Sequence, residues 1–123
     1  MKKALVVDDS RAMRMMLSSM LREIGFDVAQ AEHGQAGLTH LTSHPDTMVA
    51  LVDWNMPEMT GIEMVEAVRR DGSLRSVKLM MVTTESEMSQ MQRALGAGAD
   101  EYVMKPFDSA ILESKFAMAG LLQ

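Results

Sequence analysis

Short apolar runs alternate five times with longer amphipathic stretches, and this alternation constrains the fold more than any other feature of the sequence. The runs are rich in valine, leucine and methionine, and most of them lack the polar alternation of a half-exposed strand. They therefore predict strands that are buried on both faces, as in a parallel sheet. The expected strands lie at 4–7, 27–31, 48–52, 78–82 and 101–104.

The stretches between the runs predict helices, because their apolar residues recur every three or four positions. In the first stretch, Ser10 is a candidate N-cap and Gly25 is a candidate C-terminal stop. The residues of this stretch that share a helical spacing are Met13, Leu17, Met20 and Ile24.

Four further helices are expected along the chain. The second covers 34–43, the third lies between Gly61 and Gly72, the fourth ends at Gly96, and the fifth begins after a cap at Asp108. The apolar residues that mark the last three helices are Ile62, Val65, Val68, Met88, Met91, Leu95, Ile111, Leu112, Phe116 and Ala119.

This alternation of strand and helix predicts an α/β fold. The expected architecture is a doubly wound five-stranded parallel sheet in the order 2-1-3-4-5 with five helices. The chain has 123 residues, of which 47% are hydrophobic, and this is enough material for one core. Residues 1–123 are therefore expected to form a single domain.

Composition excludes several classes of protein. The longest apolar run, at 48–52, is far shorter than the about 20 residues of a membrane helix. The run at 4–7 is too short for a signal peptide, so a cytoplasmic protein is expected. The absence of cysteine excludes disulfides, zinc–thiolate sites and thiol nucleophiles. The net charge of −5 disfavours binding to nucleic acid.

Polar residues follow the ends of four expected strands. Asp8 and Asp9 follow the first strand, Asp53 the third, Thr83 the fourth and Lys105 the fifth. In open parallel sheets, ligands bind beyond the carboxyl ends of the strands, where the strand order reverses. These five side chains are therefore expected to converge on one crevice.

Three carboxylates in one crevice repel one another. Two unit charges about 4 Å apart cost roughly 4 kcal/mol at an effective dielectric constant of about 20. Lys105 supplies one positive charge, and a hard divalent cation with oxygen ligands, such as magnesium, suits the remainder. With the hydroxyl of Thr83, this set is typical of phosphoryl transfer, in which a carboxylate can become an aspartyl phosphate.

The arrangement resembles a response-regulator receiver domain over essentially the whole chain, which implies a flavodoxin-like fold. The segment 53–57 is especially similar to that of the stand-alone chemotaxis members of this family. The residues that carry the resemblance are Asp8-Asp9, Asp53-Trp54-Asn55-Met56-Pro57, Gly61, Thr83 and Lys105-Pro106-Phe107.

The resemblance implies a role for each of these residues. Asp53 would be the phosphoacceptor, and Lys105 would contact the phosphoryl group, with a cis peptide bond to Pro106. Thr83 would donate a hydrogen bond to a phosphoryl oxygen, and Tyr102 would be the aromatic switch that turns inward when Thr83 moves. The implied magnesium ligands are Asp9, Asp53 and the backbone carbonyl of Asn55, with Asp8 acting largely through water.

The resemblance also implies a signalling protein that promotes only its own phosphorylation and dephosphorylation. A histidine kinase would supply the phosphoryl group, and the output would be phosphorylation-dependent protein binding near Tyr102 and Lys115. The flagellar motor switch is the expected target, as in chemotaxis, and a phosphorelay intermediate or a phosphate sink is the alternative. A monomer is expected, with neither nucleic acid nor a membrane as partner.

Two other classes share parts of the pattern. An aspartyl-phosphate hydrolase needs an acid two residues after its nucleophile, where this chain has Asn55, which cannot act as that acid. A flavin-binding carrier needs a phosphate-binding loop after the first strand, where Asp8 and Asp9 would repel the phosphate. Both classes are disfavoured.

Thr84 directly follows Thr83 and is a competing candidate for the residue whose hydroxyl donates to the phosphoryl oxygen.

Histidine and methionine have structural explanations. His40 and His44 have a spacing that would allow a shared metal ion. No carboxylate completes such a site and Pro45 ends the helix there, so a solvated helix end is preferred. The 15 methionines are expected to fill the core, with Met88 and Met91 as candidates for an adaptable interface.

Overall fold

The computed structural model describes residues 2–54, 56 and 58–122, apart from the side chains of Glu85, Ser86 and Met88. Within these residues, five parallel strands form one sheet in the order β2-β1-β3-β4-β5, which confirms the predicted sheet. The strands are β1 Lys3–Val7, β2 Asp27–Ala31, β3 Val49–Asp53, β4 Lys78–Thr83 and β5 Glu101–Met104.

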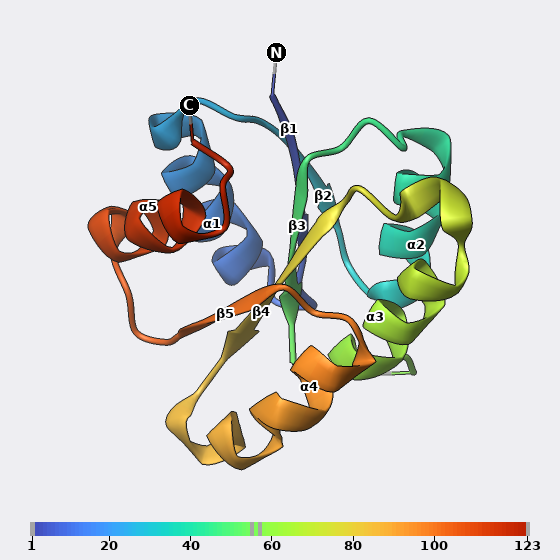
Figure 1. The fold of residues 1–123 in the computed structure, drawn as a ribbon. Coiled ribbons are helices and arrows are strands. Elements are labelled where there is room, and N and C mark those ends of the chain that lie inside the picture. The colour runs from blue at the N-terminus through green and yellow to red at the C-terminus, as the bar shows by residue number, and fades with distance from the viewer. Residues whose placement is uncertain (1, 55, 57, 123) are drawn as a thin grey trace.

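Helices cover both faces of the sheet, which confirms the doubly wound α/β architecture (Figure 1). The helices on one face are α1 Arg11–Ile24 and α5 Ser109–Met118, and those on the other are α2 Gly34–Ser43, α3 Gly61–Arg70 and α4 Met91–Ala97. The 3-10 helices η1 Gly72–Leu74 and η2 Glu85–Gln90 precede β4 and α4. No helix in the described part of the chain is long and apolar enough to cross a membrane.

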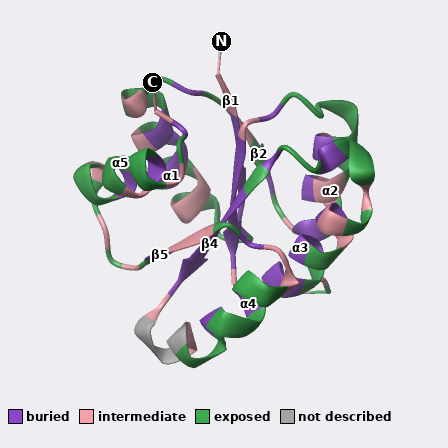
Figure 2. Cartoon of the chain, in the orientation of Figure 1, coloured by how far each residue is buried: buried purple, intermediate pink, exposed green. Residues whose placement is uncertain are grey.

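The inner strands are buried and the edge strands are partly exposed (Figure 2). Every residue of β3 is buried, and so is every residue of β1 and β4 after the first. The edge strands β2 and β5 each bury a single residue, Ala31 and Val103. The expectation of burial on both faces is therefore correct for the inner strands and wrong for the edge strands, which lack a neighbouring strand on one side.

The ends of α1 and α5 follow the predicted capping residues. Ser10 accepts a hydrogen bond from the backbone N–H of Met13 at 3.2 Å, and Asp108 accepts one from Ile111 at 2.9 Å. Gly25 closes α1 with a φ of 115°, a left-handed conformation that glycine enters without a Cβ clash. The local sequence therefore determines where these two helices begin and where α1 ends.

The fourth helix differs from its prediction. Residues 85–90 form the 3-10 helix η2, so the α-helix begins only at Met91. It then runs through Gly96 and ends at Gly98, whose φ of 124° lets its N–H donate to carbonyls of the last turn. The predicted stop at Gly96 is wrong because Gly98 is the residue that leaves the helical conformation.

Two residues that were assigned to apolar helix faces lie on the surface. The exposed fraction is 40% for Leu95 and 46% for Ile111. The buried residues of α4 are Met91 and Ala94, so the interpretation of Met91 as an interface residue is wrong. The side chain of Met88 lies outside the described residues.

Arg69 of α3 joins several segments at the edge of the sheet where β4 and β5 begin. Its guanidinium donates to the carbonyl oxygens of Gly98 at 2.9 Å, Val77 at 2.8 Å and Leu74 at 3.3 Å. It also forms an ion pair of 2.7 Å with Asp100. One side chain thus satisfies three backbone acceptors in the two connections that lead into β4 and β5, and it holds α3, α4 and the starts of these two strands together.

We predict that Arg69→Ala lowers the free energy of unfolding by about 3 kcal/mol, because hydrogen bonds to a charged group contribute about 1.5–3 kcal/mol each and some of this loss is recovered from water. Urea unfolding followed by circular dichroism measures the change. Arg70→Ala is the matched control, because Arg70 is exposed on the same helix, and it should change stability by less than about 0.5 kcal/mol. Equal stabilities of the two variants would contradict the prediction.

Candidate functional site

The register of the sheet brings the predicted site residues to one edge. β1 and β3 pair in parallel, so Asp8 and Asp9, which follow β1, lie beside Asp53 at the end of β3. Thr83 ends β4 on the other side of β3. Lys105 follows β5, and its Nζ lies 3.4 Å from Asp53 Oδ1. The convergence that was predicted from strand ends is therefore present.

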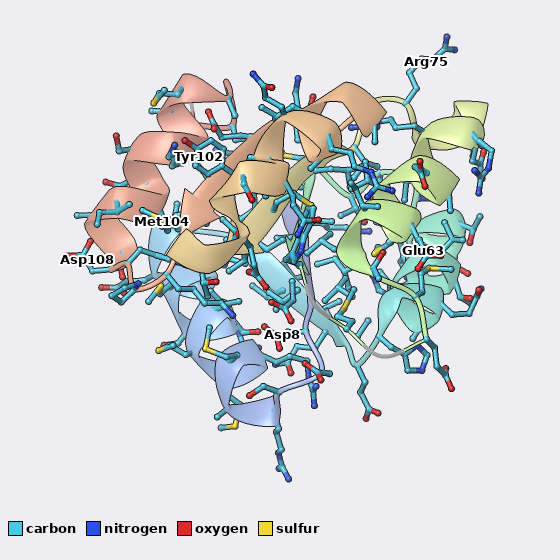
Figure 3. The ribbon with its side chains drawn as sticks, turned by 90° about the horizontal axis from the view of Figure 1, so that it is seen from below. Asp8, Glu63, Arg75, Tyr102, Met104 and Asp108 are labelled. Carbon is cyan, nitrogen blue, oxygen red and sulfur yellow. The ribbon has the colours of Figure 1, made fainter. Side chains whose placement is uncertain are left out.

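The acidic cluster consists of Asp8, Asp9 and Asp53, whose nearest carboxylate oxygens all lie within 4.8 Å of one another. The exposed fraction is 2% for Asp8 and 9% for Asp53, whereas Asp9 is exposed. Figure 3 looks onto this edge of the sheet, with Asp8 near the centre of the view between α1 and α3. The cluster therefore opens to solvent through Asp9.

Burial is the main cause of the raised pKa values of the buried carboxyl groups in this cluster. It raises the pKa of Asp53 from 3.8 to about 6, and the negative charge of Asp8 adds to the rise. The ammonium group of Lys105 opposes this change without cancelling it. Burial also raises the pKa of Asp8, although the hydrogen bond from Ser10 acts in the other direction. Ionising both carboxylates therefore costs free energy, which a bound cation would reduce.

The contacts of Asp8 fit a hard divalent cation. Asp8 Oδ1 accepts a hydrogen bond from the backbone N–H of Ser10 at 2.8 Å, and Arg14 donates to the Asp8 carbonyl oxygen at 2.7 Å. Asp8 Oδ2 is buried and has no hydrogen-bond partner among the described residues, which is uncommon for a carboxylate. Because the cluster offers only carboxylate oxygens, its chemistry suits magnesium-like or calcium-like ions better than zinc.

Gly61, the first residue of α3, lies directly against the end of β3. The backbone N–H of Gly61 donates to the carbonyl oxygen of Trp54 at 3.1 Å, and a Cβ on Gly61 would lie 2.5 Å from the carbonyl oxygen of Asp53. Only glycine lets α3 begin this close to the end of β3. Trp54 is half-buried and packs against the core. Asn55, whose backbone carbonyl is a predicted metal ligand, lies outside the described residues.

The hydroxyl of Thr83 is already engaged by neighbouring acceptors. Thr83 is fully buried, and its Oγ1 donates to Glu87 Oε1 at 3.2 Å and to the carbonyl oxygen of Thr84 at 3.3 Å. The same Glu87 oxygen accepts a hydrogen bond from the backbone N–H of Thr84 at 3.0 Å. The sequence patterns above do not single out Glu87, although Thr84 and Glu87 have the spacing of a capping box, which is the signal for this contact.

Tyr102 lies on the predicted output face. Its ring is half-buried, and Lys115 Nζ lies 4.5 Å from the ring centroid, in cation–π geometry. Lys115 Nζ also lies 3.5 Å from Glu101 Oε1. Figure 3 shows Tyr102 and Met104 along β5 beside α5. An inward rotation of the tyrosine would therefore have to break its contact with Lys115.

The peptide bond between Lys105 and Pro106 is cis, as the resemblance implies.

His40 and His44 form a stacked pair at the end of α2. Their ring centroids lie 4.2 Å apart, and His44 Nδ1 lies 3.1 Å from the carbonyl oxygen of His40. The pair closes α2 and is not part of the acidic cluster.

We predict that Asp53→Asn raises the free energy of unfolding at pH 7 by up to about 3 kcal/mol in buffer without divalent cations. A rise in pKa from 3.8 to about 6 means that the folded state holds its proton longer than the unfolded state, so the wild type loses stability as pH increases through this window. The gain should fall below about 1 kcal/mol at pH 4, where the folded state binds the proton and the unfolded state binds it in part. Urea unfolding at both pH values measures it, and a gain that is equal at the two pH values would contradict the assignment.

Comparison with known proteins shows the family. Residues 4–117 match the model of the response regulator receiver domain. Chemotaxis protein CheY1 of Helicobacter pylori is 41% identical over 114 residues, which are 92% of each chain. Chemotaxis protein CheY of Pseudomonas aeruginosa is 42% identical over 115 residues, which are 92% of this chain and 91% of that protein. The structure of chemotaxis protein CheY4 of Vibrio cholerae matches with a TM-score of 0.89 at 34% identity and covers 97% of this chain and 98% of that one. The chain therefore belongs to the response regulator receiver domain family.

Proposed function

We propose that residues 1–123 act as one receiver domain, in which Asp53 accepts a phosphoryl group from a histidine kinase and the phosphorylated form binds an output protein in chemotaxis. The observation that carries this proposal is the environment of Asp53. Its Oδ1 lies 3.4 Å from the ammonium group of Lys105, and it shares an acidic cluster with Asp8 and Asp9. A carboxylate nucleophile beside a fixed positive charge and a set of oxygen ligands is what phosphoryl transfer to aspartate needs.

Asp53 supplies the nucleophile. With a pKa of about 6, its carboxyl group is mostly ionised near neutral pH and has an electron pair available for phosphorus. An Asp53 oxygen bonds to phosphorus while the bond from phosphorus to the donor's imidazole nitrogen breaks, and the nitrogen keeps the bonding electrons. Lys105 attracts the phosphoryl oxygens, and the hydroxyl of Thr83 donates to one of them after it leaves its present acceptors.

The proposed cofactor is magnesium, held by Asp8, Asp9 and Asp53 together with the backbone carbonyl of Asn55 that the family implies. When bound, magnesium offsets the negative charge that the phosphoryl oxygens bring to the cluster. Support for this ion comes from the oxygen-only donors and from the unpartnered Oδ2 of Asp8. The task of the protein is to hold these carboxylates together despite their repulsion.

We predict that Asp53→Asn abolishes labelling by acetyl phosphate in the presence of magnesium, because an amide is not a nucleophile for phosphorus. Asp9→Ala should raise the magnesium concentration needed for half-maximal labelling by about tenfold, since it removes a charged ligand, and Thr83→Ala should change it less. Mass spectrometry of the intact protein measures the phosphorylated fraction. Asp27→Asn makes the same change on an exposed residue of β2 and should be labelled like the wild type. Labelling of Asp53→Asn at the wild-type level would exclude Asp53 as acceptor.

The role in chemotaxis is supported by the names of the similar proteins, CheY1 of Helicobacter pylori and CheY of Pseudomonas aeruginosa. The surface of α4, β5 and α5 adds physical support. It exposes Leu95 of α4, Met104 of β5 and Ile111 of α5, and the last two elements also carry Tyr102 and Lys115. Apolar anchors bordered by charged side chains suit a protein partner, and we take this partner to be the flagellar motor switch.

We predict that beryllofluoride with magnesium, which mimics the phosphoryl group on Asp53, tightens binding to the flagellar switch protein of the same organism by at least about tenfold. Lys105→Ala should keep only part of this gain, because a charge-assisted contact of about 1.5–3 kcal/mol is a large share of the roughly 5.5 kcal/mol that a complete switch requires. Fluorescence anisotropy of the labelled switch protein measures the affinity. Asp53→Asn is the negative control. A gain seen only with a histidine phosphotransfer protein would indicate a phosphorelay instead.

A further inference from the structure

The carboxylate of Glu87 accepts hydrogen bonds from Thr83, the last residue of β4, and from the next residue. Its Oε1 accepts the hydroxyl proton of Thr83 at 3.2 Å and the backbone N–H of Thr84 at 3.0 Å. Glu87 is half-buried in η2, and its own backbone N–H donates to the carbonyl oxygen of Thr84 at 3.0 Å. Hydrogen bonds to the side chain and from the backbone of Glu87 therefore hold the turn that follows Thr83.

This contact conflicts with the role of Thr83 in the proposed function. A threonine hydroxyl has one proton to donate, so the proton that Thr83 shares between Glu87 and the carbonyl oxygen of Thr84 is unavailable to a phosphoryl oxygen on Asp53. An ionised carboxylate only accepts hydrogen bonds, so it cannot stay as a partner by reversing direction. A phosphoryl group also adds negative charge close to this hydroxyl, which the charge of Glu87 opposes. Both effects separate Thr83 from Glu87 when Asp53 is phosphorylated.

We propose that Glu87 is a positioning residue that holds Thr83 in the unphosphorylated arrangement and competes with the phosphoryl group for its hydroxyl. The inference rests on the proposed function, because it needs Thr83 as a ligand of the phosphoryl group. Glu87 never touches the reacting atoms. Part of the free energy of the interaction between Thr83 and the phosphoryl group is used to break the contact between Thr83 and Glu87. Glu87 therefore sets how readily the activated state forms.

The test measures the affinity for beryllofluoride in excess magnesium by isothermal titration calorimetry. Glu87→Ala removes the charged acceptor and leaves only the carbonyl oxygen of Thr84 in competition, so this variant should bind beryllofluoride about tenfold more tightly than the wild type, as expected for the loss of a hydrogen bond to a charged group. Glu87→Gln keeps an acceptor oxygen without the charge and should fall between the two. Glu113→Ala removes the same charge from the exposed surface of α5 and should leave the affinity within about twofold.

A double-mutant cycle separates positioning from a general effect on folding. In the Thr83→Ala background, Glu87→Ala should have only a small further effect, because the hydroxyl for which Glu87 competes is absent and only the repulsion between the two negative charges remains. In the Thr83→Ser background the hydroxyl is present, and the tightening should return. A tightening that persists at its full size in Thr83→Ala, or unchanged or weaker binding by both Glu87 variants, would overturn the inference.

The same data distinguish a failure of this inference from a failure of the proposed function. Binding of beryllofluoride by the wild type and its loss in Asp53→Asn would uphold the proposed function, whatever Glu87 does. Failure of the folded wild type to bind beryllofluoride with magnesium would overturn the proposed function and this inference with it. Tightening by Glu87→Ala that depends on the Thr83 hydroxyl would support both.

Discussion

Three carboxylates that repel one another are fixed at the ends of neighbouring strands, and the rest of the site is arranged around this repulsion. Asp53 belongs to a strand that is buried throughout, so its backbone cannot shift to relieve the strain. Its pKa of about 6 records the cost, even with the ammonium group of Lys105 at 3.4 Å. The contacts of Asp8 with Ser10 and Arg14 hold the second carboxylate in the same place. The geometry of the sheet thus keeps these carboxylates close together, an arrangement that a bound cation would stabilise.

Much of this arrangement could be predicted from the sequence, because short apolar runs mark where the strands end and a common doubly wound arrangement supplies the strand order. The parallel order brings Asp8 and Asp53 together although they are far apart in the chain. Caps at Ser10 and Asp108 were equally predictable, since each depends on one side chain and a backbone N–H three residues later. The roles of Asp8, Asp53 and the other site residues, in contrast, come from resemblance to the family and not from spacing.

Features that depend on tertiary contacts could not be predicted. Gly96 and Gly98 are equivalent in the sequence, and only the position of Gly98 above Arg69 shows which of them ends α4. Leu95 fits a helical spacing with Met91, yet it is exposed, because the residues of α4 that pack into the core are Met91 and Ala94. Glu87 was overlooked for a different reason. Its spacing from Thr84 was visible, but a capping signal does not say that the same carboxylate also holds a buried hydroxyl.

The two ends of α4 are held by different contacts. Its carboxyl end is pinned where Arg69 donates to the carbonyl oxygen of Gly98, whereas Gln90 at its amino end makes no side-chain capping bond. The seven residues of the helix span about 10 Å. A rearrangement of the turn after Thr83 would therefore reach α4 at the end that lacks a capping bond, while the contact between Gly98 and Arg69 holds the other end in place.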